Sequence, residues 1–140
     1  MLTTATLADR LRVAVGRLAR RLRQQSLEGL TPSQSSILAT LDRHGPMTMS
    51  RLAEHEAVAK PSATGIVGRL FDKGLVVREP DPEDGRSSIV AISPEGVEAL
   101  EARRRERTAD LAQRIEALDE ADRAVLERAV TLFEMMIEDR

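Results

Sequence analysis

The chain of 140 residues contains no cysteine, tryptophan or tyrosine, and only two phenylalanines. The lack of cysteine excludes disulfides, thiolate metal sites and thiol redox sensing. The scarcity of aromatic rings argues against stacking on single-stranded nucleic acid. No apolar run approaches the ~20 residues of a membrane span, and the first residues do not resemble a signal peptide. We therefore expect one cytoplasmic domain without a membrane partner, a metal or a cofactor.

Charge is distributed unevenly around a formal net charge of −2. Residues 1–30 carry six arginines against two acids, and residues 31–94 carry seven basic against eight acidic side chains. Residues 95–140 carry eight arginines against thirteen acids. Because non-specific DNA affinity depends on neutralising phosphates, this pattern allows specific DNA binding but predicts weak non-specific binding.

Two helices are expected in the first third of the chain. Apolar residues at helical spacing predict a helix over 5–25, with arginines on its other face and an end at the break of residues 28–29. Thr31, Pro32 and Gln34 then form a capping box. The second helix ends at residues 44–46, and we expect three of its apolar side chains in the core: Ile37, Leu38 and Leu41.

A helix-turn-helix is predicted next. Residues 47–49 are expected to be extended, and Ser50 is expected to cap a short helix over 51–57 that buries Leu52 and Ala53. Pro61 suits the first turn of the following helix, while Lys60, which precedes proline, is expected outside it. This helix runs to Lys73 and is ended by Gly74. Two such helices joined by a short turn are a helix-turn-helix.

A β-hairpin follows, with strands over 75–79 and 88–92 and a turn-rich loop between them. The loop carries Arg86 near its tip, and Asp84 is placed to hold this side chain by a charge-assisted hydrogen bond. A helix-turn-helix followed by such a hairpin is a winged helix. Ser93, with Pro94 and Glu95 after it, is then expected to cap a long helix.

The terminal segments predict assembly into a homodimer. We expect a mostly α fold with a small β-hairpin, in which residues 31–93 form the winged helix-turn-helix and residues 1–30 and 94–140 are dimerisation helices. Their apolar faces must be buried, most simply in a two-fold dimer. The predicted interface residues are Leu7, Leu11, Leu118, Val125, Leu132, Phe133 and Met136.

The helix over 61–73 has one small and polar face. Ala63, Ile66, Val67 and Leu70 share its inner face by spacing, whereas Ser62, Gly65, Arg69 and Asp72 lie opposite. Glycine inside a helix costs ~1 kcal/mol relative to alanine, so its presence favours close approach to base edges in a major groove. Packing under a neighbouring element is the alternative explanation. Arg86 is suited to a narrow minor groove.

Other sites are less favoured by the sequence. A metal site at Asp81, Glu83 and Asp84 lacks the spacing and the closing glutamate of a calcium loop. His44 and His55 are expected to be structural, with a two-histidine metal sensor left open. The arginines of residues 103–107 can touch phosphate, bridge subunits or be solvated, and solvation is favoured. No nucleophile motif or phosphate-binding loop indicates an enzyme.

Five segments resemble the MarR family of bacterial transcriptional regulators: residues 30–34, 47–54, 69–78, 81–86 and 92–96. The resemblance covers nearly the whole chain, and the wing segment with its Asp and Arg is the most specific part. The resemblance implies a homodimer of interlocked terminal helices, with a recognition helix over 61–73 in the major groove and Arg86 in the minor groove. It also implies a ligand pocket between the winged unit and the dimer helices. Gly65 stands where many members have an arginine, so base readout is expected from Ser62, Thr64 and Arg69.

We therefore expect a ligand-responsive homodimeric repressor that binds double-stranded DNA at a near-palindromic operator. The alternative is a winged-helix module that docks on protein. Because the chain has no Tyr or Trp, we expect a pocket lined by aliphatic side chains and arginines. Such a pocket favours an amphipathic anion as the effector. The predicted DNA-contacting residues are Ser50, Lys60, Pro61, Ser62, Thr64, Gly65, Arg69, Asp84, Arg86 and Ser87.

Overall fold

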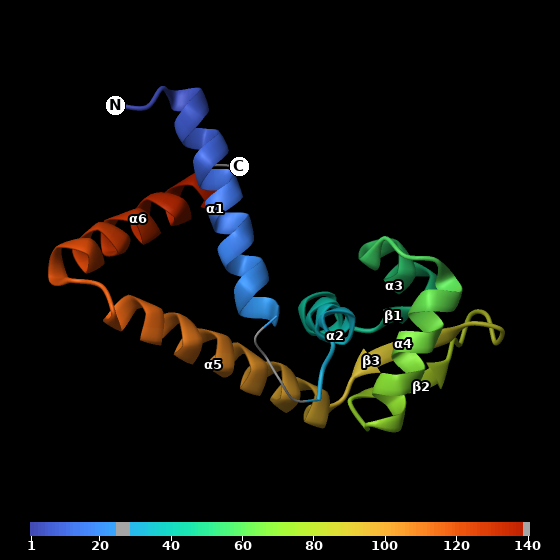
Figure 1. Ribbon diagram of the computed structural model, residues 1–140. Helices are drawn as coiled ribbons and strands as arrows, with labels where there is room; N and C mark the ends of the chain where they lie inside the picture. Colours follow the sequence, from blue (N-terminus) through green and yellow to red (C-terminus); the bar gives the residue numbers. More distant parts are fainter. Residues whose placement is uncertain (25–28, 139–140) are drawn as a thin grey trace.

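The computed structural model describes residues 1–24 and 29–138, which form six helices and three short strands (Figure 1). The helices are α1 (Thr4–Gln24), α2 (Pro32–His44), α3 (Met49–Glu56), α4 (Lys60–Asp72), α5 (Pro94–Glu116) and α6 (Glu120–Glu138). The strands are β1 (Met47–Thr48), β2 (Val76–Pro80) and β3 (Ser88–Ile92). The predicted α-rich winged helix-turn-helix is confirmed. The predicted break after α1 lies outside the described residues.

The strands form one antiparallel sheet in the order β1-β3-β2. Val76 of β2 faces Ile92 of β3, and Met47 of β1 faces Val90. The hairpin therefore has a third strand on its inner edge, as the extended residues 47–49 predicted. Met49 differs from that prediction, because it already begins α3.

The core lies between α2, α3, α4 and the sheet, and side chains from each of them form it. Its fully buried side chains include Ile37, Leu38 and Leu41, as the sequence predicted, together with Leu52 and Val67. Leu100 of α5 is buried in the same cluster, so the first turns of α5 are anchored to the winged unit. This attachment gives α5 a fixed starting point from which it extends away from the DNA-binding unit (Figure 1).

Side-chain caps define several helix ends. Thr31 and Gln34 form the predicted capping box of α2, and Ser93 caps α5 by accepting from the Gly96 N–H. Gly74 follows α4 with φ of 73°, a conformation that glycine adopts without strain. The Gly74 N–H bonds to the Phe71 carbonyl and the next N–H to the Leu70 carbonyl, which closes the end of α4.

Three predicted helix boundaries were wrong by one or two residues. Thr48, rather than Ser50, caps α3, because its hydroxyl accepts from the Arg51 N–H and places Ser50 inside the first turn. Lys60 is the first residue of α4, since the extended conformation falls on Ala59. The restriction that proline imposes on its predecessor is a preference, which the start of a helix overrides here. α4 ends at Asp72, with Lys73 as its C-cap.

Helices α1 and α6 lie apart from the winged unit. Helix α5 starts at this unit and extends outward, and α6 turns back from the far end of α5 (Figure 1). Neither α1 nor α6 contains a buried residue. Among the helices formed by the described residues, none has the length and apolar character required to cross a bilayer.

Candidate functional site

Helix α4 presents the small polar face that the sequence predicted. Ala63, Val67 and Leu70 are buried against the core, which turns the side chains of Ser62 and Arg69 to the outside. A Cβ built on Gly65 meets no atom within 4 Å. Gly65 therefore does not serve packing within this chain, and the outer surface of α4 is open to a partner that approaches closely.

The N-terminus of α4 carries no side-chain cap. Its N-cap is Ala59, and Pro61 in the first turn has no N–H of its own. The N–H groups of Lys60 and Ser62 are consequently left without a capping side chain at the positive end of the helix dipole. Such an end attracts anions, and the Lys60 side chain adds a positive charge beside it.

A cleft of about 140 Å³ joins α3, α4 and the wing. Its lining brings together five of the predicted DNA-contacting residues, which are Ser50, Lys60, Thr64, Arg86 and Ser87. The remaining lining residues are Met49, Arg78 and Ser88, so three cations and no acid border the cleft. Four predicted contacts, Pro61, Ser62, Gly65 and Arg69, lie on α4 outside this lining, and Asp84 lies outside it on the wing.

Arg78 is a cleft residue that the sequence analysis did not select. It lies on β2 opposite Val90, and its guanidinium carbon stands 4.2 Å from the centre of the Phe71 ring. This cation–π contact orients the side chain across the end of α4. Strand alternation was the available signal, because it places Arg78 on the same face as the buried Val76, beyond the edge of the core.

The hydroxyl of Thr64 has a defined role in hydrogen bonding. It donates to the Lys60 carbonyl at 2.9 Å, one turn earlier in α4. A hydroxyl has only one O–H donor, and this one is already used. Thr64 can therefore offer a ligand the lone pairs of its oxygen and its methyl group. These groups suit an amino group or a thymine methyl on a base edge.

The wing loop is shaped by its own carboxylates. Asp81 Oδ1 accepts from the Glu83 N–H at 2.9 Å, and Asp84 Oδ1 accepts from the Arg86 N–H at 3.0 Å. The predicted bond from Asp84 to the guanidinium of Arg86 was wrong, because Asp84 engages the backbone instead. Both bonds are Asx-turns, in which an aspartate side chain accepts from the backbone N–H two residues further on. They hold the backbone at Arg86 while its side chain lines the cleft.

Most of the predicted dimer residues are exposed in the single chain. The exposed members are Leu7, Val125, Leu132 and Met136, while Leu11, Leu118 and Phe133 are partly covered. Val125 retains 65% of its accessible surface and Met136 retains 58%. Helix α6 thus carries a row of apolar side chains that nothing in residues 1–24 and 29–138 buries.

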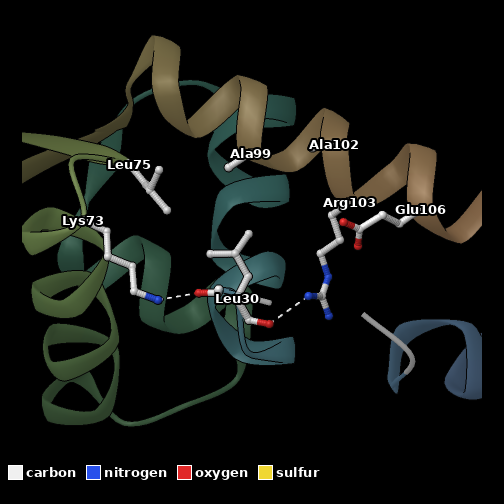
Figure 2. A pocket seen from close by; sticks show the side chains of 8 residues that line it. Leu30, Lys73, Leu75, Ala99, Ala102, Arg103 and Glu106 are labelled. Carbon is white, nitrogen blue, oxygen red and sulfur yellow. Dashed lines mark hydrogen bonds between the residues drawn. The ribbon is translucent and has the colours of Figure 1, made fainter. Parts of the chain in front are cut away.

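A second cavity of about 330 Å³ lies between α5 and the end of α4 (Figure 2). Apolar side chains line much of it, including Leu30, Leu75 and Ala99. Lys73 and Arg103 bring two positive charges, and Glu106 brings one negative charge. An aliphatic cavity with cations at its wall is chemically suited to an amphipathic anion.

The expected solvation of the arginines in residues 103–107 was wrong for Arg103, which is 3% exposed. Its Nη1 donates to the Leu30 carbonyl at 2.8 Å, and its Nη2 donates to the Arg23 carbonyl at 3.0 Å. Arg103 is buried because two backbone carbonyls from outside α5 accept hydrogen bonds from its guanidinium. Arg104 Nη1 lies 3.7 Å from Asp42 of α2.

Arg107 lies one turn after Arg103 and is partly buried. Burial lowers the pKa of its guanidinium, and the positive charges of Arg103, Arg23 and Arg104 lower it further. Its Nε is buried without a hydrogen-bond partner, as is the Nε of Arg103. Positive charge is therefore concentrated where α5 meets the end of α1.

The two histidines, distant in sequence, are neighbours in the structure. The rings of His44 and His55 have centroids 4.8 Å apart and are inclined by 33°. Within residues 1–24 and 29–138, no three histidine or carboxylate side chains gather in a group that could hold a metal ion. The ring contact joins the ends of α2 and α3.

Comparison with known proteins identifies the family. The family model for MarR matches residues 30–88. An uncharacterized HTH-type transcriptional regulator of Mycobacterium leprae is 40% identical over 136 residues, which cover 96% of this chain and 95% of that protein. The HTH-type transcriptional repressor NicR of Pseudomonas putida is 38% identical over 73 residues, which cover 52% of this chain and 46% of that protein.

Solved structures agree with this assignment. The transcriptional regulator Tm0710 of Thermotoga maritima superposes with a TM-score of 0.79 at 25% identity, covering 96% of each chain. A MarR family protein of Bacillus stearothermophilus, 24% identical, shares the fold with a TM-score of 0.69 over 98% of this chain and 99% of that one. The winged helix-turn-helix, the family match and the full-length relative together establish that this chain belongs to the MarR family of DNA-binding transcriptional regulators.

Proposed function

We propose that the chain is a homodimeric repressor that recognises a near-palindromic operator and releases it on binding a small amphipathic anion. The observation that carries the DNA-binding part is the cleft whose lining contains Lys60, Arg78 and Arg86 and no acidic residue. Three cations on a rigid helix and hairpin are suited to a duplex, because phosphate contacts position a protein on DNA. NicR, a relative over half of this chain, is named as a repressor.

Helix α4 is proposed to enter the major groove. Its exposed face offers Ser62, Thr64 and Arg69, and Gly65 lets the helix backbone approach the base edges. Arg69 is suited to a bidentate contact with guanine. The uncapped N–H groups at Lys60 and Ser62 are available to one phosphate at the groove edge.

The wing is proposed to reach the adjacent minor groove through Arg86. The backbone of this residue is held by Asp84, so the side chain is presented from an ordered turn. A narrow minor groove has an enhanced negative potential that attracts an arginine. Ser50 and Ser87 line the same cleft, and their hydroxyls are proposed to donate to phosphates between the two grooves.

The proposed dimer is formed by the terminal helices. The uncovered apolar row of α6 includes Val125, Leu132 and Met136, and α1 adds Leu7. An apolar face of this length is stabilised by burial in a second copy. A two-fold dimer presents two α4 helices, and two half-sites about one DNA turn apart then suit it.

The proposed effector site is the cavity between α5 and the end of α4. Lys73 and Arg103 suit a carboxylate, and Leu30, Leu75 and Ala99 suit an aliphatic or aromatic body. A ligand shifts a conformational equilibrium only if it binds one state better than the other. The cavity is suited to this, because Arg103 in its wall also bonds to the Arg23 carbonyl of α1, which lies outside the winged unit.

Selection from a random pool of double-stranded DNA at about 150 mM salt tests this proposal, because the pool contains every candidate operator sequence. We expect enrichment of one inverted repeat whose half-site centres lie about 10–10.5 base pairs apart. Enrichment of a single half-site would contradict the proposed dimer geometry. No enrichment from a folded protein would contradict sequence-specific binding and would favour a winged helix that docks on another protein.

A further inference from the structure

Two cations hold Gly29 and Leu30, the described residues just before the N-cap of α2. Arg103 of α5 donates to the Leu30 carbonyl at 2.8 Å, and Lys73 at the end of α4 donates to the Gly29 carbonyl. Figure 2 shows these two bonds on either side of Leu30. Because α5 follows the winged unit while Lys73 belongs to it, these two residues are fastened from two separate parts of the fold.

Arg103 also fastens the end of α1. Its Nη2 donates to the Arg23 carbonyl at 3.0 Å, one of the last carbonyls of that helix. The last four carbonyls of a helix have no partner within it, so this bond stabilises the C-terminus of α1. One buried guanidinium therefore ties the end of α1 to the start of α2.

Two of the three nitrogens of the same guanidinium, Nη1 and Nη2, are thus engaged, and the third is not. Its Nε is buried and has no hydrogen-bond partner, although the side chain is 3% exposed and lines the effector cavity. A buried donor without a partner costs ~1–3 kcal/mol, so a ligand that accepts from it gains stability. Arg107, one turn further along α5, adds positive charge nearby.

We infer that Arg103 is a latch: an effector carboxylate competes for its guanidinium with the carbonyls of Arg23 and Leu30. This inference rests on the proposed function and concerns how its effector acts. A carboxylate that binds a guanidinium side-on accepts from Nε and from the adjacent Nη2. Nη2 is the atom that now holds the Arg23 carbonyl. Binding at the free Nε therefore draws Arg103 away from the end of α1.

Release of this contact changes how the winged unit is attached. With Arg103 engaged by the ligand, the Leu30 and Arg23 carbonyls lose a charged donor, while Lys73 still holds Gly29. The winged unit then keeps its own core but loses one of its ties to α1. In a dimer built on α1 and α6, loss of this contact lets the distance between the two α4 helices change.

Sodium octanoate is a suitable probe, because it has one carboxylate and an aliphatic chain, and 1-octanol is its uncharged control. We expect octanoate, but not octanol, to bind in a calorimetric titration. We also expect it to raise amide hydrogen exchange at least about tenfold in the last turn of α1 and at Thr31, the effect of losing a charged hydrogen bond.

Substitutions separate the latch from the binding site. Arg103→Lys keeps the charge but removes the side-on donor pair, so these amides should exchange fast without ligand and octanoate should bind at least about tenfold more weakly. Arg105→Lys, at an exposed position of the same helix, is the matched control and should behave as the original chain. Lys73→Met should weaken octanoate binding but leave its effect on exchange, which keeps the test valid if Arg103→Lys fails to fold.

Each outcome has a distinct meaning. If octanoate binds without altering amide hydrogen exchange near residues 23 and 31, the competition for Arg103 is contradicted. The proposed effector site is then retained. Unchanged octanoate affinity in Arg103→Lys would equally overturn the latch. Failure of octanoate to bind the original chain would contradict the anionic effector itself and the latch with it, while DNA selection would still test the repressor.

Discussion

The hydroxyl of Ser93 donates a hydrogen bond of 2.6 Å to the carbonyl of Gly74, across 19 residues of sequence. The same hydroxyl accepts from the Gly96 N–H at 3.0 Å, and the Ser93 N–H bonds to the Leu75 carbonyl. The end of α4 is thereby joined to the first turn of α5. The helix proposed to read DNA and the helix that leads to the dimer face share one buried hydroxyl.

Replacing Ser93 by alanine removes both hydroxyl bonds and leaves the Gly74 carbonyl unpaired. We expect Ser93→Ala to lower the free energy of unfolding by about 1 kcal/mol, since it removes a helix cap, while the Gly74 carbonyl belongs to an exposed residue that water can solvate. Urea denaturation of Ser93→Ala and of the exposed control Ser33→Ala measures this. Equal midpoints for the two variants would show that the Ser93 hydroxyl contributes nothing.

Gly65→Ala separates stability from DNA recognition. The added methyl meets no atom within 4 Å, and alanine is the better helix former by ~1 kcal/mol, so the melting temperature should rise. If α4 approaches base edges at this position, operator affinity should fall. Gly96→Ala is the contrasting variant, because its methyl would stand 2.1 Å from the Leu75 carbonyl oxygen and must lower stability. Unchanged operator affinity in Gly65→Ala would show that α4 does not approach the base edges closely at this position.

Arg107→Gln is expected to stabilise the protein. The lowered pKa of Arg107 means that folding disfavours its charged form, and near neutral pH the side chain is charged in both states. Removing this charge relieves repulsion from Arg103, a like-charge pair four residues apart that costs about 0.2–0.5 kcal/mol. Thermal unfolding in low-phosphate buffer, with Arg105→Gln alongside, measures the difference. A lower melting temperature for Arg107→Gln than for Arg105→Gln would contradict the repulsion.

Val125→Glu tests the dimer face. A carboxylate on the exposed apolar row of α6 cannot be buried in a second copy without a cost of several kcal/mol, so the dimer should dissociate. Val77→Glu is the matched control, because Val77 is also an exposed valine but lies on β2 of the winged unit. Sedimentation equilibrium distinguishes the two. A dimer of unchanged strength in Val125→Glu would place the interface elsewhere.

Local signals in the sequence were sufficient to locate most of the fold. The capping box at Thr31, the cap at Ser93 and the apolar spacing of α4 each act within a few residues, so they could be recognised without tertiary contacts. The errors at Ser50 and Lys60 have the same local origin. Two hydroxyl residues compete for the cap of α3, and the preference before proline was outweighed at the start of α4.

Contacts between distant segments could not be predicted in this way. Arg103 donates to carbonyls 73 and 80 residues away, and no pattern around an arginine on a charged helix indicates that it is buried. Arg78 is oriented by Phe71 on a different element. The residues that surround the proposed effector cavity, and part of the DNA cleft, therefore emerged only from the three-dimensional arrangement.

The most direct test of DNA recognition is the affinity of the selected operator for the original chain and for Arg86→Ala, measured by fluorescence anisotropy at about 150 mM salt. Arg105→Ala, an arginine outside both proposed sites, controls for the loss of one charge. We predict that Arg86→Ala weakens operator binding at least about tenfold, within the range for loss of one arginine contact, and that it leaves the dimer intact. Equal operator affinities for Arg86→Ala and Arg105→Ala would contradict a wing that reads the minor groove.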